Sequence, residues 1–290
     1  MPANTSSELT LTPSDGSTAY YSLLYSDDIS RSRYMQTLQL IQTISTTLHD
    51  VNEPQVAEQK VHWWHEELAR MARQAAAHPA CTATQSFLHR RDCISACLSI
   101  LSAAANERYT PLATEAELQE QIGEDYKARI TLLVHALDHN EDSSAKSVEV
   151  DNNIAQALGQ WHRLNTLGLR LHNGYSVFSD AKYKQFDLGP ESLSLKKPEK
   201  MTESSALIKS EIQHARQLLQ TGVDNINDHS SSPFNRLLPL HICVHTRLAQ
   251  LKSWSKHTPD LITGTVVLTP LKKFFVAYRC RRRFNNMQSG

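Results

Sequence analysis

A clear helical pattern begins at Val51-Asn52-Glu53-Pro54-Gln55-Val56-Ala57 and continues through Lys60-Val61-His62-Trp63-Trp64-His65-Glu66-Glu67-Leu68. Proline is well suited to the first turn of a helix, so we expect a helix to begin at Pro54. Apolar residues then recur every three or four positions, the spacing of one buried helix face: Ala57, Val61, Trp64, Leu68 and Met71. Adjacent helical positions point about 100° apart, so at least one of the two tryptophans should be buried.

The same periodicity extends in both directions along the chain. A helix of about five turns follows the capping residues Asp27 and Asp28. Further helices are predicted at about 84–105, 115–138, 152–172, 203–225 and 234–256. The longest stretch without a helical pattern is 174–198, where a lid over a site would fit. We therefore predict an all-α protein with a flexible N-terminus over 1–14, one helical domain over 15–284 and a flexible tail over 285–290.

The composition excludes some classes of function. Thirty lysines and arginines balance thirty aspartates and glutamates, so the chain as a whole has no basic field that would attract nucleic acid. The sequence shows neither a signal-peptide pattern nor an apolar run of about 18 residues. We expect a cytoplasmic protein.

The residues that could bind a transition metal show no zinc-site spacing. The cysteines form no Cys-x-x-Cys pair and are interpreted as buried thiols: Cys81, Cys93, Cys97, Cys243 and Cys280. Among the 14 histidines, His62 and His65 beside Glu66 come closest to a metal-binding arrangement, but an exposed helix face explains them better. We therefore predict no metal site.

Three local patterns resemble the squalene/phytoene synthase family, the head-to-head prenyl-diphosphate transferases. Asp15-Gly16-Ser17-Thr18-Ala19-Tyr20-Tyr21-Ser22 is similar to the family's Ser-Gly-Ser-Ser-Phe-Tyr-Tyr-Ser opening. The stretch 51–68 is similar to its Val-Ser-Asp-Pro-x-Val-Ala and Lys-Leu-Ala-Trp-Trp-Arg-Glu-Glu-Val, and Tyr126-Lys127-Ala128-Arg129 resembles its Tyr-x-x-Arg. The resemblance covers most of the chain and implies a single isoprenoid-synthase-like helical bundle around a central cavity.

Members of that family carry two aspartate-rich helices that face each other across the cavity and hold Mg²⁺ ions against the diphosphates of the substrates. The first cluster, Asp-Asp-x-x-Asp-Glu, falls on Ser45-Thr46-Thr47-Leu48-His49-Asp50, where only the last acid remains. The second falls near Asn165, and its frame runs through Leu169 and Asn173; in another register Asp180 is the one acid retained. The resemblance therefore implies two degenerate metal-binding motifs and no catalytic residue.

The polar residues left at the first motif have two interpretations. Ser45 and His49 lie on one helix face, and a serine four residues before a histidine can form the hydrogen-bonded pair used in nucleophilic catalysis. No third, orienting acid is assured. We therefore favour polar remnants that line an old pocket.

A phosphate or a polyprenyl head group could still be held through charge-assisted hydrogen bonds by Tyr20, Arg108 and Arg129. In the alternative, the arginines pair with neighbouring acids such as Glu107 and Asp125, and the tyrosine packs. Both interpretations stay open. We also expect an apolar cavity for an isoprenoid tail, near Leu38, Ile41, Leu48, Leu164 and Leu167.

The segment 271–284 combines six cations with an apolar stripe of Leu271, Phe274, Phe275 and Tyr278. An amphipathic basic helix can lie on an anionic membrane, which would place the protein peripherally at the inner face. The alternative, which we favour, is a last helix docked on the fold with a solvated basic end.

The sequence thus predicts a catalytically degenerate squalene/phytoene synthase-like protein. It would act as a binding or assembly partner in isoprenoid metabolism or membrane-associated processes, with an isoprenoid lipid or a protein as its partner and no cofactor. The first alternative is an active isoprenoid diphosphate transferase that holds Mg²⁺ with atypical ligands such as Asp50, Glu53 and Asp180. The second is a helical scaffold unrelated to prenyl chemistry.

Overall fold

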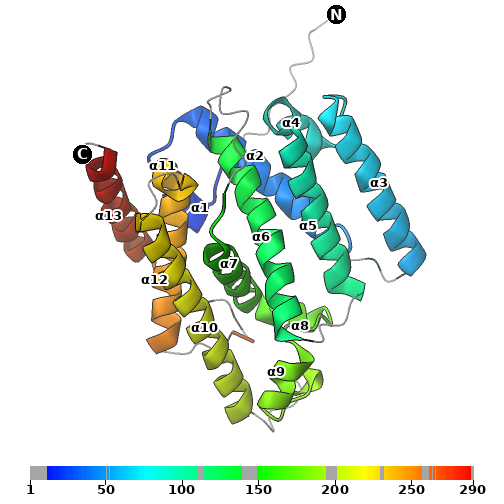
Figure 1. The fold of residues 1–290 in the computed structure, drawn as a ribbon, viewed down its shortest axis with the longest axis vertical. Helices are drawn as coiled ribbons and strands as arrows, with labels where there is room; N and C mark the ends of the chain where they lie inside the picture. Colours follow the sequence, from blue (N-terminus) through cyan, green and yellow to red (C-terminus); the bar gives the residue numbers. More distant parts are fainter. Residues whose placement is uncertain are drawn as a thin grey trace, which may run out of the picture.

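The computed structural model describes residues 12–49, 51, 53–109, 114–138, 149–193, 201–228, 232–256, 261–262, 264 and 266–288. Within these ranges the chain forms helices and no strands (Figure 1), so the predicted all-α class is confirmed. The α-helices are α1 (Thr18–Ser22), α2 (Asp28–Ser45), α3 (Pro54–Ala72), α4 (Pro79–Leu88), α5 (Arg91–Tyr109), α6 (Glu115–Leu137), α7 (Asn152–Asn165), α8 (Leu167–His172), α9 (Asp180–Gln185), α10 (Met201–Asp228), α11 (Pro233–Arg236), α12 (Leu238–Lys256) and α13 (Pro270–Gln288). A short 3₁₀ helix, η2 (Pro190–Leu193), follows α9.

Local capping chemistry accounts for several of the helix starts. The Asp27 side chain accepts a hydrogen bond from the Ser30 backbone N–H at 2.8 Å and so caps α2. Pro54 occupies the first turn of α3, as predicted. Thr114 and Glu117 form a reciprocal capping box at the start of α6, which begins at the predicted residue.

Four predicted elements differ from the structure. The helix expected at 234–256 is divided at Leu237 into α11 and α12. The helix expected at 84–105 is two helices, because His78 caps a separate α4 that begins at Pro79. The helix expected at 152–172 breaks at Thr166, next to Gly168, whose backbone closely approaches the carbonyl of Ile262. The stretch 174–198 contains α9 and η2, because Ser179 caps α9 by accepting from the backbone N–H of Lys182.

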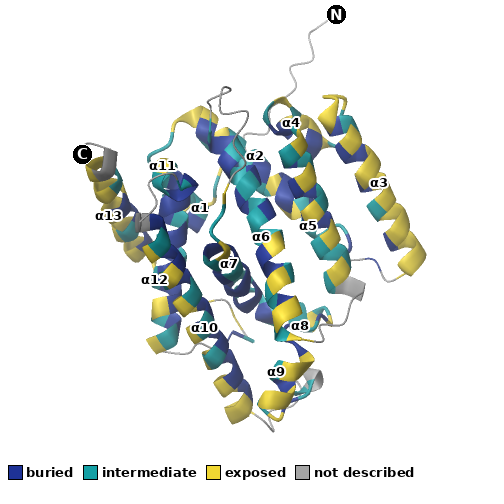
Figure 2. Cartoon of the chain, viewed as in Figure 1, coloured by how far each residue is buried: buried dark blue, intermediate teal, exposed yellow. Residues whose placement is uncertain are grey.

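Two hydrophobic clusters form most of the core and share one bundle. The larger one surrounds α7, which is almost wholly buried between α6, α10 and α12 (Figure 2). The second joins α2, α3, α4, α5 and α6. Leu133 of α6 packs against both clusters, so the described residues form one continuous helical unit.

The helices at the two edges of the bundle lie far from each other. α3 lies at one edge of the bundle and α13 at the opposite edge, against α12 (Figure 1). α13 extends to Gln288, so most of the predicted flexible tail is helical. Among the described residues, no helix combines the length and the apolar character needed to cross a bilayer.

Candidate functional site

A cavity of about 190 Å³ lies between α2, α5, α6, α7 and α8. It is the place where the C-terminal end of α2 and the turn after it, which carry the first degenerate motif, face α7 and α8, which carry the second. The expectation that Ser45 and His49 share a helix face is wrong, because α2 ends at Ser45 and His49 lies in the turn. Gly159 on α7 lines it, and a Cβ at this position would collide with the side chains of Ile122 and Tyr126 on α6. The glycine thus permits the close approach of α6 and α7 beside the cavity.

Three of the four predicted first-motif residues line the cavity: Ser45, Thr46 and His49. The Ser45 hydroxyl donates to the carbonyl of Ile41 at 2.6 Å and accepts from Nη2 of Arg129 at 3.0 Å. Its single proton is therefore committed to the backbone, and the serine is not arranged as a nucleophile activated by His49. Asp50 lies outside the described residues.

The second-motif residues are divided between the cavity and other places. Leu169 and Asn173 line the cavity from α8 and its C-terminus, opposite α2. Asn165 is half-buried outside the lining, and its Oδ1 has no hydrogen-bond partner within the described residues. Asp180 is the exposed first residue of α9 and is also outside the lining.

Two carboxylates line the described part of the cavity, Asp125 and Glu107, and both are engaged by arginines. Both Asp125 oxygens accept from Nε of Arg129 at 2.9 Å. Glu107 accepts from Nη1 of Arg163 at 3.1 Å and from Nη1 of Arg170. Three arginines and two acids leave this group of side chains with one net positive charge when all are ionised.

Burial controls the protonation of the remaining groups. Burial, with nearby arginines as smaller causes, lowers the pKa of His162 to about 3, so the imidazole is neutral at neutral pH. Burial also lowers the pKa values of Arg163 and Arg170 to about 10, which leaves both protonated at pH 7. Burial raises the pKa of Asp125 above the ordinary value for aspartate, although the Arg129 guanidinium opposes the shift.

These lining residues do not fit a magnesium cluster. Mg²⁺ requires oxygen ligands in nearly octahedral geometry, usually carboxylates that are free to bind it. In the described lining, each carboxylate has at least one oxygen bonded to a guanidinium group, and the motif positions carry hydroxyl, imidazole, amide and alkyl side chains. Instead, the guanidinium groups of Arg129, Arg163 and Arg170 line the cavity as positively charged hydrogen-bond donors.

Few of the residues predicted to bind a phosphate or an isoprenoid tail line this cavity. Of the residues considered for a phosphate, Arg129 lines the cavity and Tyr20 does not, while the Arg108 side chain lies outside the described part of the structure. The residues expected around an apolar cavity are absent from this lining and pack against the hydrophobic clusters: Leu38, Ile41, Leu48, Leu164 and Leu167. The described lining therefore mixes charged and polar side chains with a few small or apolar ones such as Ala103, Ala104 and Ile122, while these leucines and Ile41 point into the core.

The sequence analysis does not find several residues of the cavity, among them His162, Arg163 and Arg170. A local signal existed, because Gly159, Arg163, Thr166 and Arg170 recur every three or four positions and so share a face. Their partners could not be found in this way. Glu107 is 56 residues from Arg163 and 63 from Arg170 along the chain.

Comparisons with known proteins identify the family and the fold of this chain. The family model described as squalene/phytoene synthase matches residues 12–257. Among solved structures, a dehydrosqualene synthase crystallised with a ligand is similar with a TM-score of 0.71 and 11% identity, over 93% of this chain and 92% of that one. Squalene synthase HpnC from Alicyclobacillus acidocaldarius is similar with a TM-score of 0.52 and 15% identity, over 92% and 88% of the two chains. At these identities the structural matches establish the fold alone, and no curated protein sequence matches the chain.

Proposed function

Because this chain belongs to the squalene/phytoene synthase family, we propose that it is a binding or assembly partner built on the fold of those enzymes, without their Mg²⁺-dependent condensation. The observation that carries the proposal is the pairing of both described cavity carboxylates with arginines, Asp125 with Arg129 and Glu107 with Arg163 and Arg170. An arginine already bonded to each acid leaves little room for a metal cation beside it.

The chemistry of the lining supports an anionic ligand. Arginine donors bind phosphate oxygens through charge-assisted hydrogen bonds, and they do so without a metal. The neutral His162 adds a polar group without a competing negative charge. A cavity of about 190 Å³ is below the range of about 300–1,000 Å³ that is typical of sites for drug-sized ligands. We therefore propose that the cavity holds the phosphate-bearing head of a ligand, such as an isoprenoid diphosphate, rather than two complete prenyl chains.

The transferase alternative depends on acids that converge on a shared ion. Glu53 precedes α3 and Asp180 begins α9; both are exposed, and neither lines the cavity. This separation favours the binding role over the enzymatic one. The unrelated-scaffold alternative is less well supported, because residues from both motif regions line one cavity.

Calorimetric titration with inorganic diphosphate and with farnesyl diphosphate tests the binding role. We expect the same affinity in EDTA as in Mg²⁺, because the ligand is held by guanidinium groups. Arg170→Gln should weaken binding about tenfold, since a hydrogen bond to a charged group contributes about 1.5–3 kcal/mol. Glu107 keeps Arg163 as its partner in this variant, so no acid is left buried and unpaired.

Lys127→Gln is the matched control, because Lys127 lies on α6, pairs with Glu124 and is outside the cavity lining. Its affinity should equal that of the unmodified chain. Binding that disappears in EDTA would contradict the proposal and favour the transferase. No binding of either ligand would favour the scaffold alternative.

A peripheral membrane contact is a second proposed role, and it rests on α13. The apolar stripe of this helix faces outward, with exposed fractions of 40–65%: Leu271, Phe274, Phe275 and Tyr278. The opposite side of α13 is buried through Lys273, Ala277 and Cys280. An exposed apolar stripe flanked by arginines suits the boundary of an anionic bilayer.

A further inference from the structure

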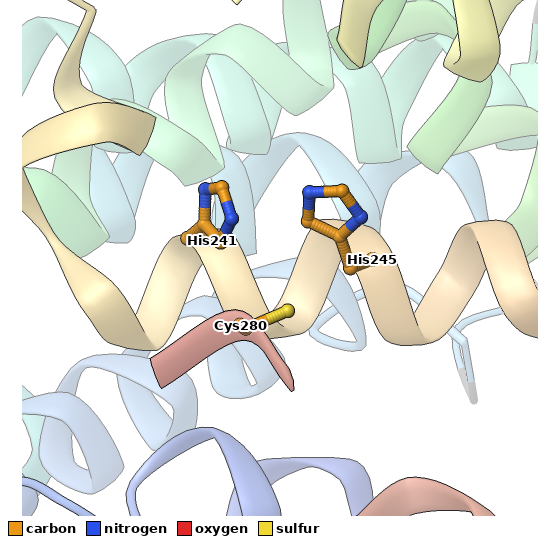
Figure 3. Close-up of side chains that lie close together, drawn as sticks. All are labelled: His241, His245 and Cys280. Atoms are coloured by element: carbon orange, nitrogen blue, oxygen red, sulfur yellow. The ribbon is translucent and has the colours of Figure 1, made fainter. Parts of the chain in front are cut away.

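His241 and His245 lie one turn apart on α12, and Cys280 approaches them from α13 (Figure 3). Their ligand atoms, one imidazole nitrogen from each histidine and the cysteine Sγ, all lie within 4.8 Å of one another. In a tetrahedral zinc site such atoms stand roughly 3.3–3.6 Å apart, so small side-chain rotations bring this set to metal-binding distances. None of the three residues lines the cavity described above.

His241 is oriented as a metal ligand would be. The residue is 4% exposed, and its Nε2 is buried with no hydrogen-bond partner in the described part of the chain. A hydrogen bond to the backbone carbonyl of Phe234 partly offsets the lowering of its pKa by burial. Histidine ligands commonly have one nitrogen held by a carbonyl and the other directed at the metal.

The three side chains differ in their surroundings: Cys280 lies among apolar residues, and His245 is partly accessible to solvent. Cys280 is 4% exposed and packs with Ile242 and Ala277, whereas His245 is only partly buried. The imidazole rings of His241 and His245 have centroids 4.5 Å apart. A metal ion would therefore have two protein faces around it and a path from solvent beside His245.

We propose that His241, His245 and Cys280 bind a borderline-soft divalent metal ion, Zn²⁺ before others, with a fourth position for water. Two imidazoles and one thiolate match the ligand preferences of Zn²⁺, whereas Mg²⁺ and Ca²⁺ take oxygen ligands. On binding, each imidazole nitrogen donates a lone pair to the ion. The Cys280 thiol gives its proton to solvent, and the resulting thiolate forms the Zn–S bond.

The ion would join α12 to α13 and so fix the C-terminal helix on the bundle. Arg283 places a positive charge near both histidines, which opposes a cation. The thiolate is then essential, because it reduces the charge of the bound ion from two to one. Arg283→Gln should accordingly strengthen metal binding, while the loss of Cys280 should weaken it.

The sequence spacing alone could not reveal this site. His241 and His245 have helical spacing, but the third ligand comes from a separate helix. In the sequence, His62 and His65 come closer to a metal-binding spacing. Both are exposed on α3, where Nε2 of His62 lies 3.4 Å from Oε1 of Glu66.

Titration of the full chain with Co²⁺ and Zn²⁺ tests the proposal. Co²⁺ should give a thiolate-to-metal charge-transfer band in the near ultraviolet and tetrahedral d–d bands, and one equivalent of Zn²⁺ should remove them. Zn²⁺ should also raise the Tm, because a ligand that binds the folded state stabilises it. Cys280→Ser should abolish the charge-transfer band, and His245→Gln, at a partly exposed position, should lower Zn²⁺ affinity about tenfold or more.

Two controls separate this site from incidental binding. Cys243→Ser removes a thiol of α12 that does not belong to the cluster, so it should leave the cobalt spectrum unchanged. The double variant His62→Gln/His65→Gln should also leave it unchanged. If no thiolate band appears in the unmodified chain, or if the band survives in Cys280→Ser, the proposal is overturned.

Discussion

Trp63 and Trp64 are neighbours in the chain but have different environments. Trp64 is 3% exposed, and its indole N–H donates to the Thr47 hydroxyl at 2.7 Å. Trp63 is 40% exposed. The prediction that at least one of the pair is buried is therefore confirmed, and the buried one joins α3 to the residues that follow α2.

This difference predicts unequal effects of mutation. Trp64→Ala should lower the free energy of unfolding by about 3–5 kcal/mol, because it leaves a cavity in the core and removes a hydrogen bond. Trp63→Ala should lower it by less than about 1 kcal/mol. Urea denaturation followed by far-ultraviolet circular dichroism measures both. Equal losses in the two variants would show that the exposed indole also contributes to the core.

Individual residues of the candidate site could be predicted only in part. The resemblance to the family predicts that Ser45, Thr46 and His49 line the cavity, and the structure places them there. These residues lie at the end of α2 and in the turn after it. Asp180 does not line the cavity, because it is the exposed first residue of α9. The ion pairs of Glu107 with α7 and α8 are long-range contacts and leave no periodic signal in a single sequence.

At the scale of elements, most helices are predictable from the spacing of their apolar residues and from their caps. The predicted starts at Pro54 and Glu115 are accurate, because a first-turn proline and a threonine cap mark them, and α2 begins within one residue of the prediction, with Asp27 rather than Asp28 as its cap. The break between α4 and α5 is not predicted, although the polar run 89–92 interrupts the apolar pattern there. Periodicity finds a helical face but does not detect a short interruption of it.

The orientation of α13 leads to a prediction about membranes. Phe274→Ser with Phe275→Ser should strongly reduce sedimentation of the protein with anionic phospholipid vesicles, since two exposed rings that would enter the bilayer boundary are lost. About 0.5 M salt should weaken the binding of the unmodified chain, because it shortens the reach of the cations.

Point variants are preferable to deletion of α13, because Ala277 and Cys280 pack on α12 and their removal would expose the core. Ile29→Ser is the matched control: Ile29 is an exposed apolar residue on α2, remote in sequence from the basic helix. Its sedimentation should be unchanged. Unmodified protein that stays in the supernatant at low salt would show that α13 is a structural cap.

At the scale of the whole molecule, buried histidines predict acid sensitivity. Burial lowers the pKa of His162 and of His245 to about 3, and it lowers the pKa values of His135 and His241 as well. In the unfolded chain these rings titrate near pH 6.5, so below that pH the unfolded state binds more protons and is favoured. Buried acids with raised pKa values, such as Glu211, act in the opposite direction at lower pH.

We therefore expect the free energy of unfolding, measured in EDTA, to fall by roughly 2–4 kcal/mol between pH 7 and pH 5, about 2 kcal/mol for each histidine whose pKa is lowered to about 3, less the opposing effect of the buried acids. His162→Gln should reduce this dependence, because one titrating group is removed. Lys127→Gln should not change it. A stability that is constant across this range would contradict the neutral, buried state of these histidines.

We propose that this member of the family keeps the helical fold but has no carboxylates free to bind Mg²⁺ around its cavity, because the acids there are bonded to arginines. Incubation of the purified chain with farnesyl or geranylgeranyl diphosphate and Mg²⁺, followed by chromatography of the lipid extract, tests this proposal. We predict no condensed product above a heat-killed control, either for the unmodified chain or for Ser45→Asp/Thr46→Asp/His49→Asp, which leaves the opposite motif without acids. A head-to-head condensed prenyl product from the unmodified chain would contradict the account.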